Sequence, residues 1–202
     1  MSADHDVFVS RFNRMLAVCV WVLCALSVGG LLLRPENVQF FYLVPPAFFA
    51  VLAAEFLWAP RLVVSDRKIT VRNPLRTIVI PWNALIQVDT KFSLTLYTPG
   101  RRFAVWAAPA PGRATVRRAN PGGATPADTL FRTREPRPSD LPGTESGDAA
   151  GLVRARWERL QATDLIEPGL AERTLVSVQV PVVTVTALAL LFIGSLASAF
   201  LN

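Results

Sequence analysis

The sequence predicts an α+β membrane protein in which three transmembrane helices accompany a small antiparallel β domain and an amphipathic helix. Hydrophobic residues make up 51% of the chain and charged residues only 18%, whereas soluble domains are about one quarter charged. The apolar residues gather in three blocks, each long enough to cross a bilayer as a helix. Between the second and third blocks, short stretches alternate with period two and are separated by turn residues, which is typical of antiparallel strands.

Residues 1–60 predict an N-terminal tail and a transmembrane hairpin with spans at 15–33 and 40–58. Arg11 and Arg14 precede the first span, and a signal peptide has a similar basic start. The first apolar block is longer than the usual core of a signal peptide, however, and a second block follows almost at once. We therefore expect a retained span that turns back through a short loop.

A few polar side chains lie within these apolar blocks. Glu55 is near the end of the second block beside Trp58 and Arg61, where we expect it to be paired or to reach the interface. An intramembrane acid can instead mark a proton or ion path, but three spans offer few polar side chains to line one. Cys19 and Cys24 do not share a helix face, so we expect neither a disulfide nor a metal site there.

The third predicted span, 176–201, ends the sequence and carries small residues at Gly194, Ser195 and Ser198 that allow close packing on a neighbouring helix. Three spans place the two termini on opposite sides of the membrane. Arginines are frequent before the first span and between the second and third. The positive-inside rule therefore predicts a multi-pass protein of the cell membrane with its N-terminus and β domain in the cytoplasm and its C-terminus outside.

Residues 61–106 predict the β domain, with about six short strands and a hairpin turn at Pro99-Gly100-Arg101. This segment holds eight basic residues against two acidic ones. Two interpretations stay open. The charge is sufficiently explained by cytoplasmic topology, or it forms a surface held against anionic lipid headgroups.

Residues 107–148 change character, because seven prolines interrupt any periodicity and large apolar side chains are few. Such a segment cannot offset its ordering entropy by burial, so we expect a mobile linker or an excursion from the sheet. Residues 149–165 then predict an amphipathic helix. We expect its apolar side to cover the sheet, and the alternative is that Trp157 anchors it on the membrane. The apolar side consists of Leu152, Val153, Trp157 and Leu160.

The β domain resembles the bacterial pleckstrin-homology (PH)-like family found in many actinobacterial membrane proteins. The resemblance rests on Asp66-Arg67, on the strand Ile69-Thr70-Val71-Arg72-Asn73 and on the step Ile80-Pro81-Trp82. It implies a split antiparallel barrel closed by a C-terminal helix, here 149–165. The long Pro-rich segment and the third span depart from the family pattern. Members of the family are mostly of unknown function, so the resemblance implies a fold and not an activity.

Basic loops of PH folds bind phosphate groups, which gives four candidate contacts for a lipid headgroup or a protein partner. The alternative is that these residues are solvated charges on a cytoplasmic face. The four are Arg67, Lys68, Arg72 and Arg76. Trp82 and Trp157 are candidate structural residues. We expect Trp82 to be buried at a corner of the sheet, and stacking on a ligand is its alternative role.

The sequence has no recognisable catalytic constellation, because its single histidine is His5 and no Gly-rich phosphate loop follows a strand. We therefore predict no enzyme activity, no cofactor, no metal, no small-molecule substrate and no nucleic-acid partner. The expected partners are the lipid bilayer and a membrane protein. The leading hypothesis is a membrane-anchored interaction module, an accessory or assembly component of a membrane complex. The alternative is a sensor of anionic lipid headgroups at the cytoplasmic face.

Overall fold

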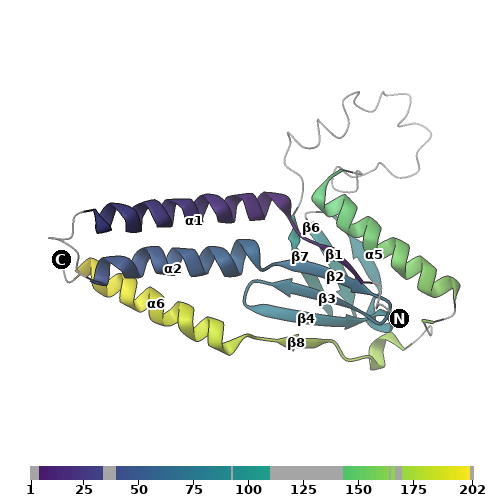
Figure 1. The fold of residues 1–202 in the computed structure, drawn as a ribbon. Helices are drawn as coiled ribbons and strands as arrows, with labels where there is room; N and C mark the ends of the chain where they lie inside the picture. Colours follow the sequence, from purple (N-terminus) through teal and green to yellow (C-terminus); the bar gives the residue numbers. More distant parts are fainter. Residues whose placement is uncertain are drawn as a thin grey trace. The chain divides into compact units, whose positions relative to one another are not determined.

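A computed structural model describes residues 5–33, 40–91, 93–109, 143–163, 165–166 and 170–200 (Figure 1). The structure is α+β, with two antiparallel sheets and three long apolar helices. The chain divides into two compact units. The sheet unit contains the residues up to Val9, Arg61–Arg72 and Ile78–Val178. The helical unit contains Ser10–Pro60, Asn73–Thr77 and Gln179–Asn202.

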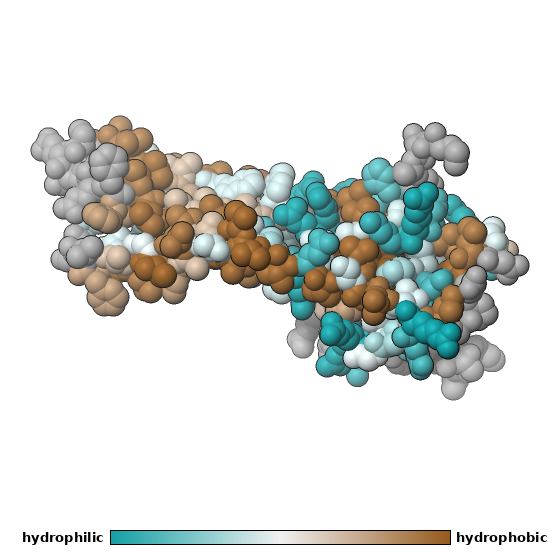
Figure 2. All heavy atoms as spheres, turned by 90° about the horizontal axis from the view of Figure 1, so that it is seen from below, coloured by the Kyte–Doolittle hydropathy of each residue, from teal (hydrophilic) through white to brown (hydrophobic). Residues whose placement is uncertain are grey.

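The helical unit holds three helices that are long and apolar enough to cross a membrane, at Arg11–Leu32, Phe41–Trp58 and Val182–Phe200. The first is α1 and the third is α6. Hydrophobic side chains cover most of the visible surface of these helices in Figure 2, whereas the sheet unit shows mostly hydrophilic ones. This distribution is expected of helices whose whole circumference faces lipid or other helices.

The middle helix is not uniform along its length. It begins as a short 3₁₀ helix, η2 (Phe40–Leu43), continues as α2 (Val44–Ala53) and ends as a π-helical turn, η3 (Ala54–Trp58). Pro45 and Pro46 occupy the first positions of α2, where the missing N–H groups would have no intrahelical partner in any case. The sequence therefore tolerates two prolines without breaking the span.

The three helices lie side by side, with α2 in the middle (Figure 1). On the α1 side, the indole Nε1 of Trp21 donates a hydrogen bond to the carbonyl oxygen of Ala50 at 3.0 Å. On the α6 side, the backbones approach closely at Gly194, where a Cβ atom would lie only 3.1 Å from Cγ1 of Val44. Small residues allow such an approach between helices in lipid.

The larger sheet has five strands in the order β1-β2-β3-β4-β8. Register pairs β1 antiparallel to β2, with Phe8 opposite Leu62, and β2 antiparallel to β3, with Leu62 opposite Val71. Alternate residues of β2, β3 and β4 are buried, as period two requires. The strands are β1 (His5–Phe8), β2 (Arg61–Ser65), β3 (Lys68–Asn73), β4 (Arg76–Pro81) and β8 (Ser177–Gln179).

The smaller sheet is a three-stranded meander of β5 (Gln87–Asp89), β6 (Ser93–Thr98) and β7 (Arg101–Pro109). The β6–β7 hairpin turns at Pro99 and Gly100, and Gly100 has φ +69°, a value that glycine adopts without strain. A 3₁₀ helix, η4 (Trp82–Ala84), connects the two sheets between β4 and β5.

Helix α5 (Glu145–Ala162) packs on β2 of the larger sheet and on all three strands of the smaller one. It thereby closes the core of the sheet unit (Figure 1). Its buried apolar residues are Ala149, Ala150, Val153 and Leu160. The side chain of Arg154 donates to the carbonyl oxygen of Val88 at 3.4 Å, so it covers part of strand β5.

Several observed boundaries differ from those expected. The expected β domain of 61–106 extends to Pro109, and the helix expected over 149–165 begins at Glu145 and ends at Ala162. Most of the expected linker 107–148, namely residues 110–142, lies outside the described residues. The expected N-terminal tail contains β1, and the segment expected to begin the third span at 176 contains β8, with α6 starting only at Val182. Both added strands pair at edges of the larger sheet, which is a tertiary contact that local sequence does not encode.

Candidate functional site

The turn between β2 and β3 presents two of the predicted basic residues on a fixed backbone. The hydroxyl of Ser65 donates to the carbonyl oxygen of Lys68 at 2.7 Å, and the amide of Lys68 donates back to the same hydroxyl at 3.3 Å. Asp66 and Arg67 form the turn between them. Arg67 and Lys68 are both exposed. The side chain of Ser65 therefore closes this turn locally, as serine often does at turns.

Trp82 supports the same turn from inside the protein. Its side chain is buried, and its indole Nε1 donates to the carbonyl oxygen of Ser65 at 2.8 Å. Trp82 begins the 3₁₀ helix η4 directly after Pro81, the last residue of β4. Two sequence features that carried the family resemblance, Asp66-Arg67 and Ile80-Pro81-Trp82, thus meet at one point of the fold.

Arg156 of α5 makes a third contact that fixes the β2–β3 turn. Its side chain is 5% exposed and forms ion pairs with Asp6 of β1, at 2.8 Å, and with Asp66 of the turn. The two carboxylates are 43% and 56% exposed. A buried guanidinium is tolerated only when it is paired and hydrogen-bonded. This cation therefore holds together three segments that are far apart in the sequence.

The other two predicted basic residues lie elsewhere. Arg72 is near the far end of β3, opposite Arg61 of β2, and Arg76 begins β4 after the next turn. Arg72 lies four positions after Lys68 on the extended strand, which is about 13 Å. The four candidate residues therefore form two pairs at opposite ends of β3 and not one cluster.

Glu55 accepts a backbone hydrogen bond within the helical unit. It lies in η3, is 7% exposed, and its Oε1 accepts from the amide of Leu75 at 3.3 Å. Leu75 is in the turn between β3 and β4 and has φ +57°, which costs a residue with a Cβ atom about 1–2 kcal/mol. We expected Glu55 to be paired or to reach the interface beside Arg61. The partner in this hydrogen bond is the backbone amide of Leu75.

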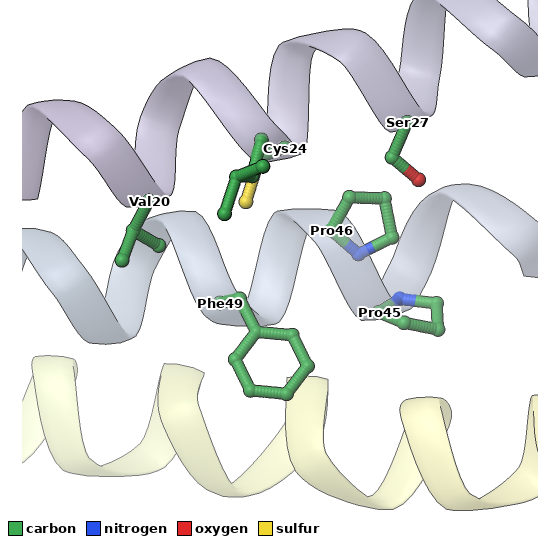
Figure 3. A pocket seen from close by; sticks show the side chains of 7 residues that line it. Val20, Cys24, Ser27, Pro45, Pro46 and Phe49 are labelled. Atoms are coloured by element: carbon green, nitrogen blue, oxygen red, sulfur yellow. The ribbon is translucent and has the colours of Figure 1, made fainter.

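A groove of about 440 Å³ lies between α1 and α2 (Figure 3). Its lining is almost entirely apolar, with Cys24 and Ser27 as its most polar side chains. Cys24 is half-buried there, whereas Cys19 is exposed. The lining residues are Val20, Leu23, Cys24, Ser27, Pro45, Pro46 and Phe49.

Trp157 packs against the core beneath α5 and is partly buried. Its indole nitrogen is inaccessible to solvent and has no hydrogen-bond acceptor among the described residues. The same part of the chain contains no group of three or more His, Cys, Asp or Glu side chains placed to hold a metal ion.

Sequence reasoning missed Asp6, Arg156 and Leu75. Asp6 and Arg156 are 150 residues apart, and nothing local marks either as half of an ion pair. The burial of Arg156 could have been suspected, because it is adjacent to Trp157 on a helix that was expected to cover the sheet. Leu75 occupies the turn position after Pro74, where a left-handed conformation favours glycine. A leucine at that position therefore does not predict the left-handed conformation.

Replacing the buried guanidinium should destabilise the sheet unit. Arg156→Gln is expected to cost about 1–3 kcal/mol, because both ion pairs are lost while the half-exposed carboxylates can still hydrate. Arg159→Gln, the same change at an exposed position of α5, should stay within about 0.5 kcal/mol of the parent. Unfolding of the detergent-solubilised full chain, followed by tryptophan fluorescence, measures both. Equal stability of the two variants would mean that the ion pairs of Arg156 contribute nothing to the free energy of unfolding.

The two structural tryptophans should respond differently to loss of the indole N–H. Trp82→Phe breaks the hydrogen bond to Ser65, whereas Trp157→Phe removes a donor that has no acceptor among the described residues. Trp82→Phe is therefore expected to lower the free energy of unfolding by about 1–2 kcal/mol more than Trp157→Phe. Urea titration of the full chain in detergent checks this difference, and a reversed order would show that the Ser65 contact does not stabilise the turn.

Comparison with known protein families finds one match, to the bacterial PH domain, over residues 59–163. The matched segment runs from the end of the second helix through β2 to β7 and α5, and it covers more than half of the 202 residues. No curated protein and no solved structure matches the chain. The β2–β3 turn, the supporting Trp82 and the closing helix α5 all lie inside the match. This chain belongs to the bacterial PH domain family.

Proposed function

We propose that this chain is a membrane-anchored PH-domain protein that serves as an accessory or assembly component of a membrane complex, and that its sheet unit binds a membrane-protein partner. It is a multi-pass protein of the cell membrane with its N-terminus and sheet unit in the cytoplasm and its C-terminus outside. The three apolar helices and the positive-inside rule support this topology. The proposal includes no enzymatic reaction, no nucleic acid and no small-molecule substrate.

The observation that carries the proposal is the triply fixed β2–β3 turn. The hydroxyl of Ser65, the indole of Trp82 and the guanidinium of Arg156 all hold this turn, while Arg67 and Lys68 extend from it into solvent. A preorganised backbone loses little conformational entropy when a partner binds. A turn that needed only to connect two strands would not require a buried cation and a buried tryptophan beneath it.

The charges around the turn favour a protein partner over a bilayer surface. Arg67 and Lys68 follow Asp66 in the chain, and the carboxylates of Asp6 and Asp66, both paired with Arg156, are each about half exposed. Such a mixed pattern is complementary to another mixed protein surface and imposes register on it. A uniformly anionic bilayer would meet attraction and repulsion at the same place.

The proposal predicts that partner retention depends on the basic pair of this turn. A tagged full chain, extracted from native membranes in a mild detergent, should retain a stoichiometric partner identified by mass spectrometry. Arg67→Glu combined with Lys68→Glu should reduce that retention about tenfold or more through charge reversal. The matched control reverses the exposed pair Arg101 and Arg102 on the β6–β7 hairpin and should leave retention unchanged.

Two outcomes would count against the proposal. A chain that comes away alone in repeated extractions has no stable partner. A partner lost equally on reversal of either basic pair responds to net charge and not to the β2–β3 turn.

A second candidate function is sensing of anionic lipid headgroups, and the register of β2 and β3 favours it. Arg61 and Arg72 stand opposite each other on neighbouring strands, so two basic residues meet at this end of β3. Arg61 follows the second apolar helix almost directly, and Arg76 belongs to the segment Asn73–Thr77 of the helical unit. Basic residues next to a span are the ones that contact anionic headgroups.

Lipid sensing predicts that anionic lipid stabilises the full chain in a salt-dependent way. Nanodiscs with 30% phosphatidylglycerol should raise the melting temperature relative to phosphatidylcholine alone, and high salt should remove the gain. Arg72→Gln with Arg76→Gln should lower the stabilisation by about 2 kcal/mol, whereas Arg67→Gln with Lys68→Gln should retain it. Indifference of the wild-type chain to lipid charge would exclude this function.

A further inference from the structure

The second apolar helix ends in an unusual way, because its last turn is a π-helical turn. The amide of Ala59 donates to the carbonyl oxygen of Ala54, five residues earlier, at 2.8 Å. A π turn contains one more residue than an α turn, and it is less stable, so it persists where it positions a side chain. Here the turn contains Glu55, whose carboxylate is buried.

The carboxylate of Glu55 meets a backbone that is itself strained. Its Oε1 accepts from the amide of Leu75, which has a left-handed φ of +57° although it carries a Cβ atom. Pro74 fixes the preceding φ, and glycine would be the favoured residue at the position of Leu75. The strained turn therefore has a ready alternative, in which Leu75 returns to a negative φ and its amide leaves Glu55.

The helix end that carries Glu55 is held firmly from the side of α1. Trp58, the last residue of the π turn, lies 5.2 Å from the ring of Trp21, and the guanidinium of Arg14 stands 4.9 Å over the Trp58 ring. Trp21 also donates to the carbonyl oxygen of Ala50, just before the π turn. These contacts stabilise the closed form of the helix end, in which the carboxylate of Glu55 reaches the amide of Leu75.

We infer that Glu55 is a latch that holds the β3–β4 turn in its left-handed conformation, so that this turn and the π turn of the second apolar helix open and close together. The turn joins the ends of β3 and β4, so its conformation sets how those two strands end. A change in the strands would release the amide of Leu75, and a change in the helix would withdraw the carboxylate. The latch is a two-state element that both sides bias.

The latch stands on contacts within the helical unit and requires no binding partner. Its test is therefore independent of the function proposed above, and each can fail without the other.

Hydrogen exchange of the full chain in nanodiscs, read by mass spectrometry, tests the latch. Glu55→Ala should speed exchange in peptides covering residues 73–77 about tenfold, the loss expected for one stabilising hydrogen bond. Glu55→Gln keeps an acceptor oxygen and should remain close to the parent. Leu75→Gly removes the strain, so the double variant Glu55→Ala with Leu75→Gly should regain much of the protection that Glu55→Ala alone loses.

The reciprocal change tests whether the two turns move together. Leu75→Pro removes the donor and cannot adopt a positive φ, so exchange in residues 54–60 should also rise. Peptides of α5, at residues 145–162, report on the integrity of the sheet unit and should not change in any variant. Unchanged exchange at 73–77 in Glu55→Ala, purely additive effects in the double variant, or an equal rise in α5 would each overturn the latch.

Discussion

The buried guanidinium of Arg156 is the interaction on which the sheet unit most depends. It is the point where β1, the β2–β3 turn and α5 come together, and its two carboxylate partners remain half exposed. An arginine is suited to this place, because its planar fork can serve two carboxylates at once. Burying such a charge without partners would be strongly unfavourable. Closure of the core by α5 and pairing of the N-terminal strand with the sheet therefore stabilise each other through Arg156.

The ion pair of Arg156 with Asp66 lies at the β2–β3 turn, where the Ile80-Pro81-Trp82 step also makes contact. Trp82 and Arg156 both hold the β2–β3 turn, the first through the carbonyl oxygen of Ser65 and the second through the carboxylate of Asp66. A buried tryptophan and an ion pair thus fix the backbone that carries the exposed Arg67 and Lys68. In the helical unit, the contact between Trp21 and Trp58 fixes the end of the second apolar helix. The carboxylate of Glu55 there accepts a hydrogen bond from the turn between β3 and β4.

The repetitive parts of this fold were predictable from the sequence. Apolar blocks gave the three long helices, and period-two alternation gave six strands that correspond to β2–β7. The rest depends on contacts between distant residues. Strand β1 is defined by its pairing with the distant strand β2, and Asp6 acquires its role only from Arg156. The π turn and the left-handed Leu75 lack sequence signals because tertiary contacts, and not local preference, stabilise them.

Strands β1 and β8 form the two edges of the larger sheet, next to β2 and β4, and both lie outside the segment that matches the bacterial PH domain. A fragment cut to residues 59–163 would therefore carry two edge strands, β2 and β4, with unpaired backbone groups along their outer sides. Such edges are templates for pairing with other chains. Recombinant versions trimmed to the family boundaries would tend to self-associate, and their aggregation would say nothing about the stability of the intact protein.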